Sequence, residues 1–159
     1  MHPSAQRVVD AAAAQDLAIE VHEVPDGTRT AEDAARAVGV EVGQIVKSLV
    51  FSVSGETVLA LVSGSNRLDE HALARAAGRD RTAVERLDAK AVRAATGFSI
   101  GGVPPFGHPT PLSTFVDRDL LRYGTLWAAA GTPRHVFSTT VEALVRITGA
   151  TVTDLRDEK

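Results

Sequence analysis

Two consecutive apolar segments near the middle of the chain constrain the fold most strongly. Residues 44–53 read QIVKSLVFSV and residues 57–64 read TVLALVSG, with the turn signal Ser-Gly-Glu between them. Apolar and β-branched residues on both sides of a glycine-containing turn are typical of a β-hairpin. The second segment is apolar on both faces, which indicates that other elements cover it from both sides. We therefore expect a central, buried hairpin.

Helical and strand patterns follow one another irregularly around this hairpin. Helices are expected at residues 4–17, 28–39, 69–77, 88–96 and 141–148, and further strands at 18–24, 112–117, 125–131, 134–140 and 151–155. Thr30 with Asp33, and Thr139 with Glu142, match the capping-box pattern for a helix start. This order differs from a regular βαβ alternation. It favours one α+β domain spanning residues 1–159, with a curled mixed sheet and helices outside it.

Composition sets limits on the class of protein. With 159 residues, of which 44% are hydrophobic, the chain can form a sizeable core in one domain. It contains no apolar run long enough to span a membrane, and its first residues lack the features of a signal peptide. The absence of cysteine excludes disulfides and a thiolate nucleophile. A cytoplasmic protein without a membrane partner is the simplest expectation.

Charge is distributed unevenly along the chain. Residues 1–43 contain three arginines and eight acidic residues, whereas residues 67–93 contain seven basic and five acidic residues. A basic segment on an acidic protein can contact nucleic-acid phosphates. The candidates for such contacts are Arg75, Arg79, Arg81, Arg86 and Arg93. The alternative is an ordinary solvated helical surface.

Lys47 is the most informative single residue. Because strand side chains alternate between faces, Lys47 shares a face with Ile45, Leu49, Phe51 and Val53. This is the more apolar face and is expected to point inward. A buried, unpaired ammonium is costly, so Lys47 is expected at the mouth of a cavity that takes an anionic or carbonyl-bearing ligand. The alternatives are a β-bulge that turns the side chain outward, or a lysine that extends past the sheet edge.

The segment SIGGVPPFGHPTP, residues 99–111, has three glycines and four prolines in thirteen positions. We call it the Gly/Pro loop. Proline lacks a backbone N–H and breaks helices, so the loop can be neither a helix nor an interior strand. It is either a rigid connection or a backbone surface shaped for a ligand.

Other candidate chemistry is limited. The five histidines lack metal-site spacing, no phosphate-binding or dinucleotide-binding glycine motif occurs, and no Ser-His-Asp set can be assigned. Neither a metal nor a cofactor is expected. His135 shares a strand face with Phe137, which favours a hydrogen-bonded core histidine. Trp127 and Phe115 are likewise expected in the core.

Three segments together resemble the YbaK/EbsC family: IVKSLVF (45–51), GFSIGGVPPFGH (97–108) and GTPRHVF (131–137). This family includes the editing domain inserted in bacterial-type prolyl-tRNA synthetases and free-standing relatives. The resemblance extends over almost the whole chain, with the segments in the family's order. It implies a barrel-like mixed sheet with surrounding helices, and trans-editing deacylation of mischarged aminoacyl-tRNA.

The resemblance also implies roles for individual residues. Lys47 falls on the functional lysine, and Gly101 and Pro105 fall on the fixed positions of a GxxxP loop. Gly102, Val103 and Pro104 complete that loop, and Gly131 and His135 join them as substrate-binding candidates. Glycines let the backbone N–H groups at 101–103 approach an aminoacyl carbonyl or a terminal ribose. Family members that act on cysteinyl-tRNA carry an aspartate at the position of Val136, so this chain is closer to the GxPRHVF branch.

The sequence therefore predicts an aminoacyl-tRNA deacylase with tRNA(Pro)-type substrates. An aminoacyl ester is already activated, so positioning and charge suffice in a site without cysteine, metal or triad. One alternative is a non-catalytic module that binds aminoacyl-tRNA or a nucleotide, and another is a hydrolase of small aminoacyl esters. The expected partner is mischarged aminoacyl-tRNA, with a synthetase as a further candidate, and the protein is a monomer or a homodimer.

Overall fold

The central hairpin pairs without interruption along its whole length. In the computed structural model, which describes residues 2–157, strand β2 (Val46–Val53) runs antiparallel to β3 (Glu56–Ser63). Ser54 and Gly55 connect them, and both have positive φ, of 52° and 84°. A two-residue turn with positive φ at both positions matches the right-handed twist of the flanking strands.

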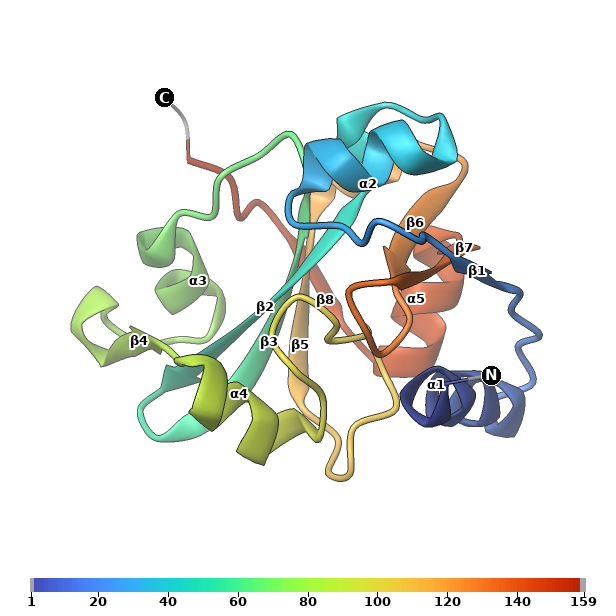
Figure 1. Cartoon of the computed structure of the whole chain (residues 1–159). Helices are drawn as coiled ribbons and strands as arrows, with labels where there is room; N and C mark the ends of the chain where they lie inside the picture. The colour runs from blue at the N-terminus through green and yellow to red at the C-terminus, as the bar shows by residue number, and fades with distance from the viewer. Residues whose placement is uncertain (1, 158–159) are drawn as a thin grey trace.

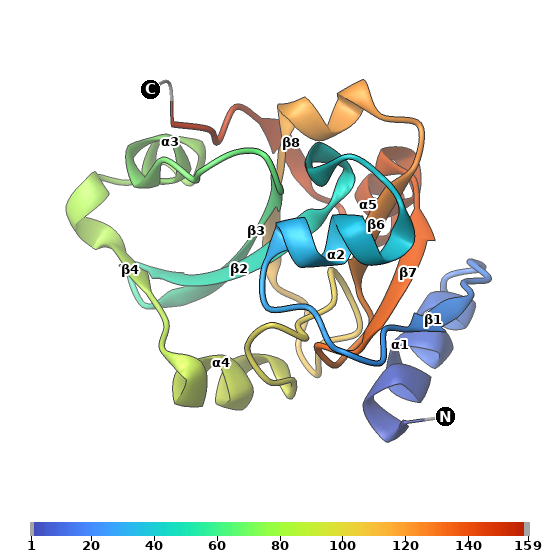
Figure 2. The ribbon, with the colours of Figure 1, turned by 45° about the horizontal axis from the view of Figure 1, so that its top comes forward.

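Six further strands complete two sheets (Figures 1 and 2). The larger sheet has the order β4-β2-β3-β5-β8, and the smaller has the order β1-β7-β6. The additional strands are β1 (Val21–Glu23), β4 (Val84–Arg86), β5 (Ser113–Asp117), β6 (Leu126–Ala129), β7 (His135–Thr139) and β8 (Thr151–Thr153). A parallel bridge between Ile45 and Trp127 joins the start of β2 to β6. The result is the expected α+β domain with a curled mixed sheet, which over residues 2–157 does not close into a barrel.

In the described part of the chain, residues 2–157, five short α-helices surround the sheets. They are α1 (Pro3–Ala14), α2 (Ala31–Val38), α3 (Glu70–Ala76), α4 (Ala89–Thr96) and α5 (Val141–Thr148). Three 3-10 turns occur as well: η1 (Val42–Gln44), η2 (Arg81–Ala83) and η3 (Arg118–Arg122). Over residues 2–157 no helix is both long enough and apolar enough to cross a membrane.

The helix ends follow from local sequence with one correction. The Thr30 side chain accepts a hydrogen bond from the Asp33 N–H at 3.1 Å, as expected for the cap of α2. For α5 the capping residue is Thr140, whose side chain accepts from the Ala143 N–H, and not Thr139. Thr139 remains in β7, because its backbone is paired with Leu126.

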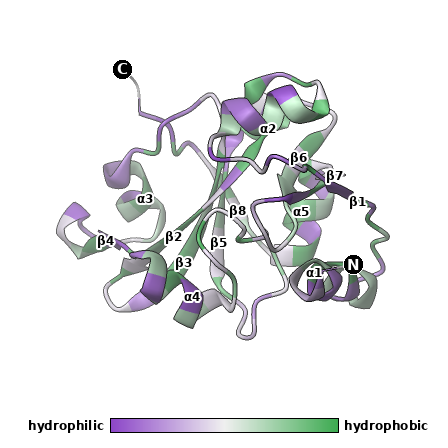
Figure 3. Ribbon diagram, in the orientation of Figure 1, coloured by the Kyte–Doolittle hydropathy of each residue, from purple (hydrophilic) through white to green (hydrophobic). Residues whose placement is uncertain are grey.

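The core lies on both sides of the central hairpin. Val46 and Val50 face a cluster that includes Leu59 and Leu61, whereas Phe51 packs on the opposite side. The second cluster also contains Val53, Val58, Ala60 and Val62. Figure 3 shows hydrophobic stretches along the central strands and hydrophilic ones on the outer helices. The hairpin is therefore covered on both faces. The apolar pattern on both faces of β3 predicts this, whereas the prediction of a single inward face for β2 was incomplete.

Candidate active site

A cavity of about 450 Å³ lies between β2, α2, β6 and the Gly/Pro loop. This volume falls within the usual range for small-molecule sites. Much of its wall is apolar and includes Val46, Leu49, Val50, Val92, Val103 and Val136. Four charged side chains also line it: Arg29, Glu32, Lys47 and Arg86. An apolar cavity with a few charged groups suits a ligand that combines an apolar part with phosphate, carbonyl or ammonium groups.

The strand order opens this cavity at the edge of β2. Strand β4 pairs with β2 only along Phe51–Val53, and the Leu87 N–H donates to the Val50 carbonyl beyond that point. Residues 46–50 line the cavity, with β4 ending on one side and the bridge at Ile45 on the other. A short third strand thus leaves space for a ligand beside the central hairpin.

Lys47 lies at this edge and is half-buried. Its Nζ donates a hydrogen bond to the backbone carbonyl of Asn66. Burial lowers the pKa of Lys47, and the carboxylates of Glu32 and Asp117 oppose this shift. The register of β2 on β3 is continuous through Lys47, which rules out the bulge alternative. Leu49 lines the same cavity, whereas Phe51 is buried in the core and does not.

The Gly/Pro loop is anchored to the core by apolar side chains. Val103 and Phe106 are buried, as is Phe98 directly before the loop. Gly101 has a φ of +87° and lines the cavity together with Val103. A backbone held by apolar anchors on both sides of Gly101 keeps that residue at the cavity wall.

Other predicted residues of the loop lie behind the wall. The Gly102 N–H donates to the Ser99 carbonyl at 3.0 Å, so this N–H is already paired within the loop. A Cβ on Gly102 would lie 2.6 Å from the Thr132 Cα, which shows a close approach of backbone to backbone. The Pro104 carbonyl contacts His108 Nε2 at 2.9 Å, and neither Pro104 nor Pro105 lines the cavity. These three residues shape the loop.

The segment 131–137 contributes a different residue from those predicted. Neither Gly131 nor His135 lines the cavity, because Gly131 approaches the backbone of Ser4 and His135 Nδ1 contacts Thr132 Oγ1 at 2.6 Å. Val136 points to the other face of β7 and does line the cavity. The position where the resemblance implies an aspartate in members that act on cysteinyl-tRNA therefore lies at the cavity wall, and in this chain it is the apolar Val136.

The five predicted phosphate-contacting arginines divide into two groups. All are exposed: Arg75, Arg79, Arg81, Arg86 and Arg93. Only Arg86 lines the cavity. Arg81 forms an ion pair with Glu70, and Arg79 donates to the Gly78 carbonyl. Their elements, α3, β4 and α4, lie on one side of the molecule (Figure 1).

Most residues that line the cavity were not predicted as site residues, and three of them have side chains that bear on ligand binding. Ile100 is 48% exposed and lines the cavity, where it offers an apolar rim. Trp127 also lines the cavity rather than lying wholly in the core, and its ring packs edge-on against His22 at 5.2 Å. Glu32 lies in the first turn of α2. An acidic residue in a helix start is ordinary in sequence terms, so only the fold reveals that it borders the cavity.

Comparison with known proteins identifies the family of the chain. The chain matches the family described as "Aminoacyl-tRNA editing domain" over residues 25–147, a range that contains every residue lining the cavity. A crystal structure described as "a putative trans-editing enzyme for prolyl tRNA synthetase" superposes with a TM-score of 0.93 at 49% identity, covering 99% of both chains.

Two curated relatives extend this finding. A protein of Enterococcus faecalis named "Putative Cys-tRNA(Pro)/Cys-tRNA(Cys) deacylase EbsC" is 30% identical over 141 residues, which cover 82% of this chain and 84% of that protein. A proline–tRNA ligase of Nitratidesulfovibrio vulgaris is 35% identical over 99 residues, 62% of this chain but only 17% of the ligase. The chain belongs to the aminoacyl-tRNA editing domain family, as the resemblance to the YbaK/EbsC family predicts.

Proposed function

We propose that this protein hydrolyses the ester bond of a mischarged tRNA, with tRNA(Pro) as the carrier. One observation carries the proposal: the half-buried Lys47 ammonium and the glycine backbone at 101 line the same cavity. The relatives named as a deacylase acting on Cys-tRNA(Pro) and as a trans-editing enzyme for prolyl-tRNA synthetase support the choice of tRNA.

The charges of the cavity match those of an aminoacyl ester at the tRNA end. Such an ester carries a polar carbonyl, neighbouring phosphates and a free α-ammonium group. Lys47 and Arg86 suit the carbonyl or the terminal phosphate, and Glu32 suits the ammonium. The Glu32 carboxylate also opposes the lowering of the Lys47 pKa by burial, and both side chains line the cavity that the ester would occupy.

The reaction needs little chemistry from the protein. The oxygen of a water molecule adds to the ester carbonyl carbon, the bond to the ribose oxygen breaks, and a proton from the water passes to that ribose oxygen. A nucleophilic side chain of the substrate can replace water and then releases the amino acid as a cyclic ester or thioester. Attack by the adjacent ribose hydroxyl moves the aminoacyl group between the two ribose oxygens and still requires water to release it. With water the products are the free amino acid and a tRNA ending in its ribose hydroxyl. Lys47 stabilises the negative charge that develops on the carbonyl oxygen or fixes the terminal phosphate, and the loop orients the ester.

The apolar wall limits which amino acid is accepted. Val136, Val103 and Ala128 offer no polar partner for a side chain at that wall. An apolar pocket of this kind distinguishes amino acids mainly by size, and weakly where they differ by one methylene. We therefore expect activity on more than one small amino acid.

The proposed substrate and site also indicate the partner, the compartment and the oligomeric state that we expect for the reaction. Free mischarged tRNA, produced by a synthetase, is the proposed partner, and this places the reaction in the cytoplasm. All residues around the cavity belong to one chain, so a monomer can carry the site.

Single-turnover deacylation of tRNA(Pro) charged with alanine, cysteine, serine or threonine tests the proposal. We expect rapid hydrolysis of at least one of these, and little of prolyl-tRNA(Pro). Binding without turnover on every substrate would instead indicate a binding module. Equal, salt-insensitive activity on a short aminoacyl ester would indicate a small-ester hydrolase, because loss of phosphate contacts removes salt dependence.

A further inference from the structure

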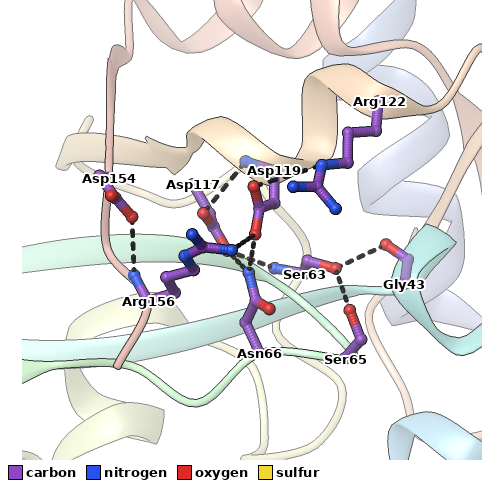
Figure 4. Close-up of polar contacts among 9 residues, drawn as sticks. All are labelled: Gly43, Ser63, Ser65, Asn66, Asp117, Asp119, Arg122, Asp154 and Arg156. Carbon is purple, nitrogen blue, oxygen red and sulfur yellow. Dashed lines mark hydrogen bonds and ion pairs between the residues drawn. The ribbon is translucent and has the colours of Figure 1, made fainter. Parts of the chain in front are cut away.

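The backbone carbonyl that accepts the hydrogen bond from Lys47 belongs to a polar network that joins four parts of the chain (Figure 4). Its central residue is Asn66, in the loop after β3. The Asn66 Nδ2 donates to Asp117 Oδ2 and to Asp119 Oδ2, each at 2.8 Å. The two N–H bonds of one amide group are thus both used. Because both neighbours are carboxylates, only this orientation of the amide satisfies them.

The two carboxylates are themselves fixed. Asp117 is fully buried, and its side chain also accepts hydrogen bonds from the backbone N–H groups of Ser63 and Asp119, each at 3.2 Å. Arg122 and Arg156 lie 3.5 and 3.4 Å from Asp119. The hydrogen bond from Asn66 is the main cause that lowers the pKa of Asp119. Asn66 is therefore held between two ionised groups that cannot easily move.

The backbone of the same loop is held as well. The Asn66 N–H donates to the Ser63 carbonyl at 2.9 Å, and the Asp69 N–H donates to the Leu155 carbonyl at 2.8 Å. Leu68 forms a β-bridge with Arg156. Because the side chain and the backbone of Asn66 are both fixed, its backbone carbonyl oxygen has one orientation. This oxygen accepts the hydrogen bond from Lys47 Nζ.

We infer that Asn66 is a positioning residue for Lys47. The hydrogen bonds of its side chain fix its backbone carbonyl, and this carbonyl holds the Lys47 ammonium at the cavity. One of the three ammonium N–H groups is then bound to protein, and two remain for a ligand. The other charged groups near Lys47 are Glu32 on α2, Arg86 on β4 and Asp117 at the end of β5. None of these has a hydrogen bond to Lys47 over residues 2–157, so the Asn66 carbonyl alone sets its direction.

Nitrogen-15 NMR of the lysine ammonium groups tests this inference directly. The chain has only three lysines, at positions 47, 90 and 159, so the Lys47 signal can be assigned with one Lys47→Arg variant. The variant under test is Asn66→Ala, which keeps the backbone carbonyl but removes the side-chain hydrogen bonds to Asp117 and Asp119 that help to fix it. The matched control is Ser65→Ala, because within residues 2–157 the Ser65 hydroxyl forms a hydrogen bond with the Ser63 hydroxyl and none with Asp117 or Asp119.

Asn66→Ala is expected to speed proton exchange of the Lys47 ammonium by about tenfold, since a hydrogen bond to a charged group is lost from its fixed position. The effect on deacylation rests on the proposed function. In that reaction we expect the single-turnover rate at saturating protein to fall by about tenfold, because positioning acts on the geometry of the reacting groups. The protein concentration that gives half of the maximal rate should change less than about twofold. Ser65→Ala is expected to leave all three quantities unchanged.

Unchanged exchange and an unchanged saturating rate in a folded Asn66→Ala protein, even with a lower melting temperature, would make Asn66 structural and overturn the inference. If this variant does not fold, Asp119→Asn removes one of the two anchoring charges and should give a smaller acceleration of exchange. No acceleration there would overturn the inference equally. A wild-type protein that deacylates nothing would refute the proposed function alone, because the NMR comparison needs no substrate.

Discussion

The two walls of the cavity are held in place by different forces. On the β2 side, Lys47 is directed by a chain of hydrogen bonds through Asn66 to the buried Asp117. On the opposite side, the Gly/Pro loop is fixed by burial of Phe98, Val103 and Phe106. Polar contacts hold a charge in one direction, whereas apolar anchors and prolines hold a backbone shape.

This difference has consequences for both walls. A change on the β2 wall should alter the chemistry of the site while the apolar core remains. A change on the loop wall should alter backbone geometry and stability together. The four substitutions below, from the largest expected effect to the smallest, test whether the two walls can be separated in this way.

Lys47→Ala should lower deacylation by about 10²–10³-fold, because the group that stabilises developing charge is lost. Stability should hold or rise, since a half-buried ammonium is removed. Burial lowers the pKa of Lys47, so at alkaline pH the unfolded chain binds more protons than the folded protein. The stability gained should therefore be largest near neutral pH and fade as pH rises through the range where Lys47 titrates. Single-turnover rates and melting curves against pH measure both effects.

Lys90→Ala provides the control for loss of a lysine charge, because Lys90 is exposed and does not line the cavity. It should leave the deacylation rate unchanged. A Lys47→Ala protein that melts much earlier yet deacylates at the parent rate would make Lys47 a structural residue.

Gly101→Ala should lower the rate by about tenfold and stability by about 1 kcal/mol, because its φ of +87° disfavours a Cβ at the cavity wall. Gly55→Ala is the matched control. Its φ is +84°, it has nothing within 4 Å of the added Cβ, and it lies in the hairpin turn away from the cavity. It should lose similar stability but no activity, as thermal melts and rates would show. Equal loss of activity in both variants would remove the loop from the site.

Glu32→Gln should lower the deacylation rate on aminoacyl esters with a free α-ammonium group by about fivefold. An effect of this size is typical for the loss of one contact between solvent-accessible charges. An N-acetylated substrate lacks the α-ammonium group, so the variant should act on it at the wild-type rate. Comparison of the two substrates therefore separates recognition of the ammonium from a general effect on Lys47. If both substrates slow equally, Glu32 acts through Lys47 instead.

Arg86→Ala should have the smallest effect, a change in the salt dependence of tRNA binding of about one unit of slope. The same change at Arg75, on α3 and outside the cavity lining, provides the comparison. Binding measured at several salt concentrations gives both slopes. Identical slopes for both variants and the wild type would show that these arginines belong to an ordinary solvated surface and do not contact tRNA phosphates.

Local features of the fold could be predicted from sequence. The cap at Thr30 and the hairpin turn at Ser54–Gly55 depend on residues close together in the chain. The alternation of β2 placed Lys47 correctly at a cavity for the same reason. Strand β4 was missed, because its three residues pair with β2 only in the folded chain.

The residues missed at the site share one property. Asn66 and Asp117 are 51 positions apart and meet only because β5 lies beside β3. Glu32, Ile100 and Trp127 reach the cavity from three separate elements. Gly102 was expected to face the ligand, yet its close approach is to Thr132 on the protein's own backbone. The sequence indicates that a glycine is needed at such a position, but it does not show which neighbouring group leaves no space for a side chain.

A crystal structure with an amide-linked aminoacyl-adenosine, which the protein cannot hydrolyse, tests the central claim most directly. The claim is that the aminoacyl group binds in the cavity between β2 and the Gly/Pro loop. We expect its carbonyl oxygen or terminal phosphate within hydrogen-bond distance of Lys47 Nζ, and Gly101 in contact with the aminoacyl or ribose group. An analogue bound elsewhere, such as the groove beside Phe106 and His108, with Lys47 untouched, would contradict the account.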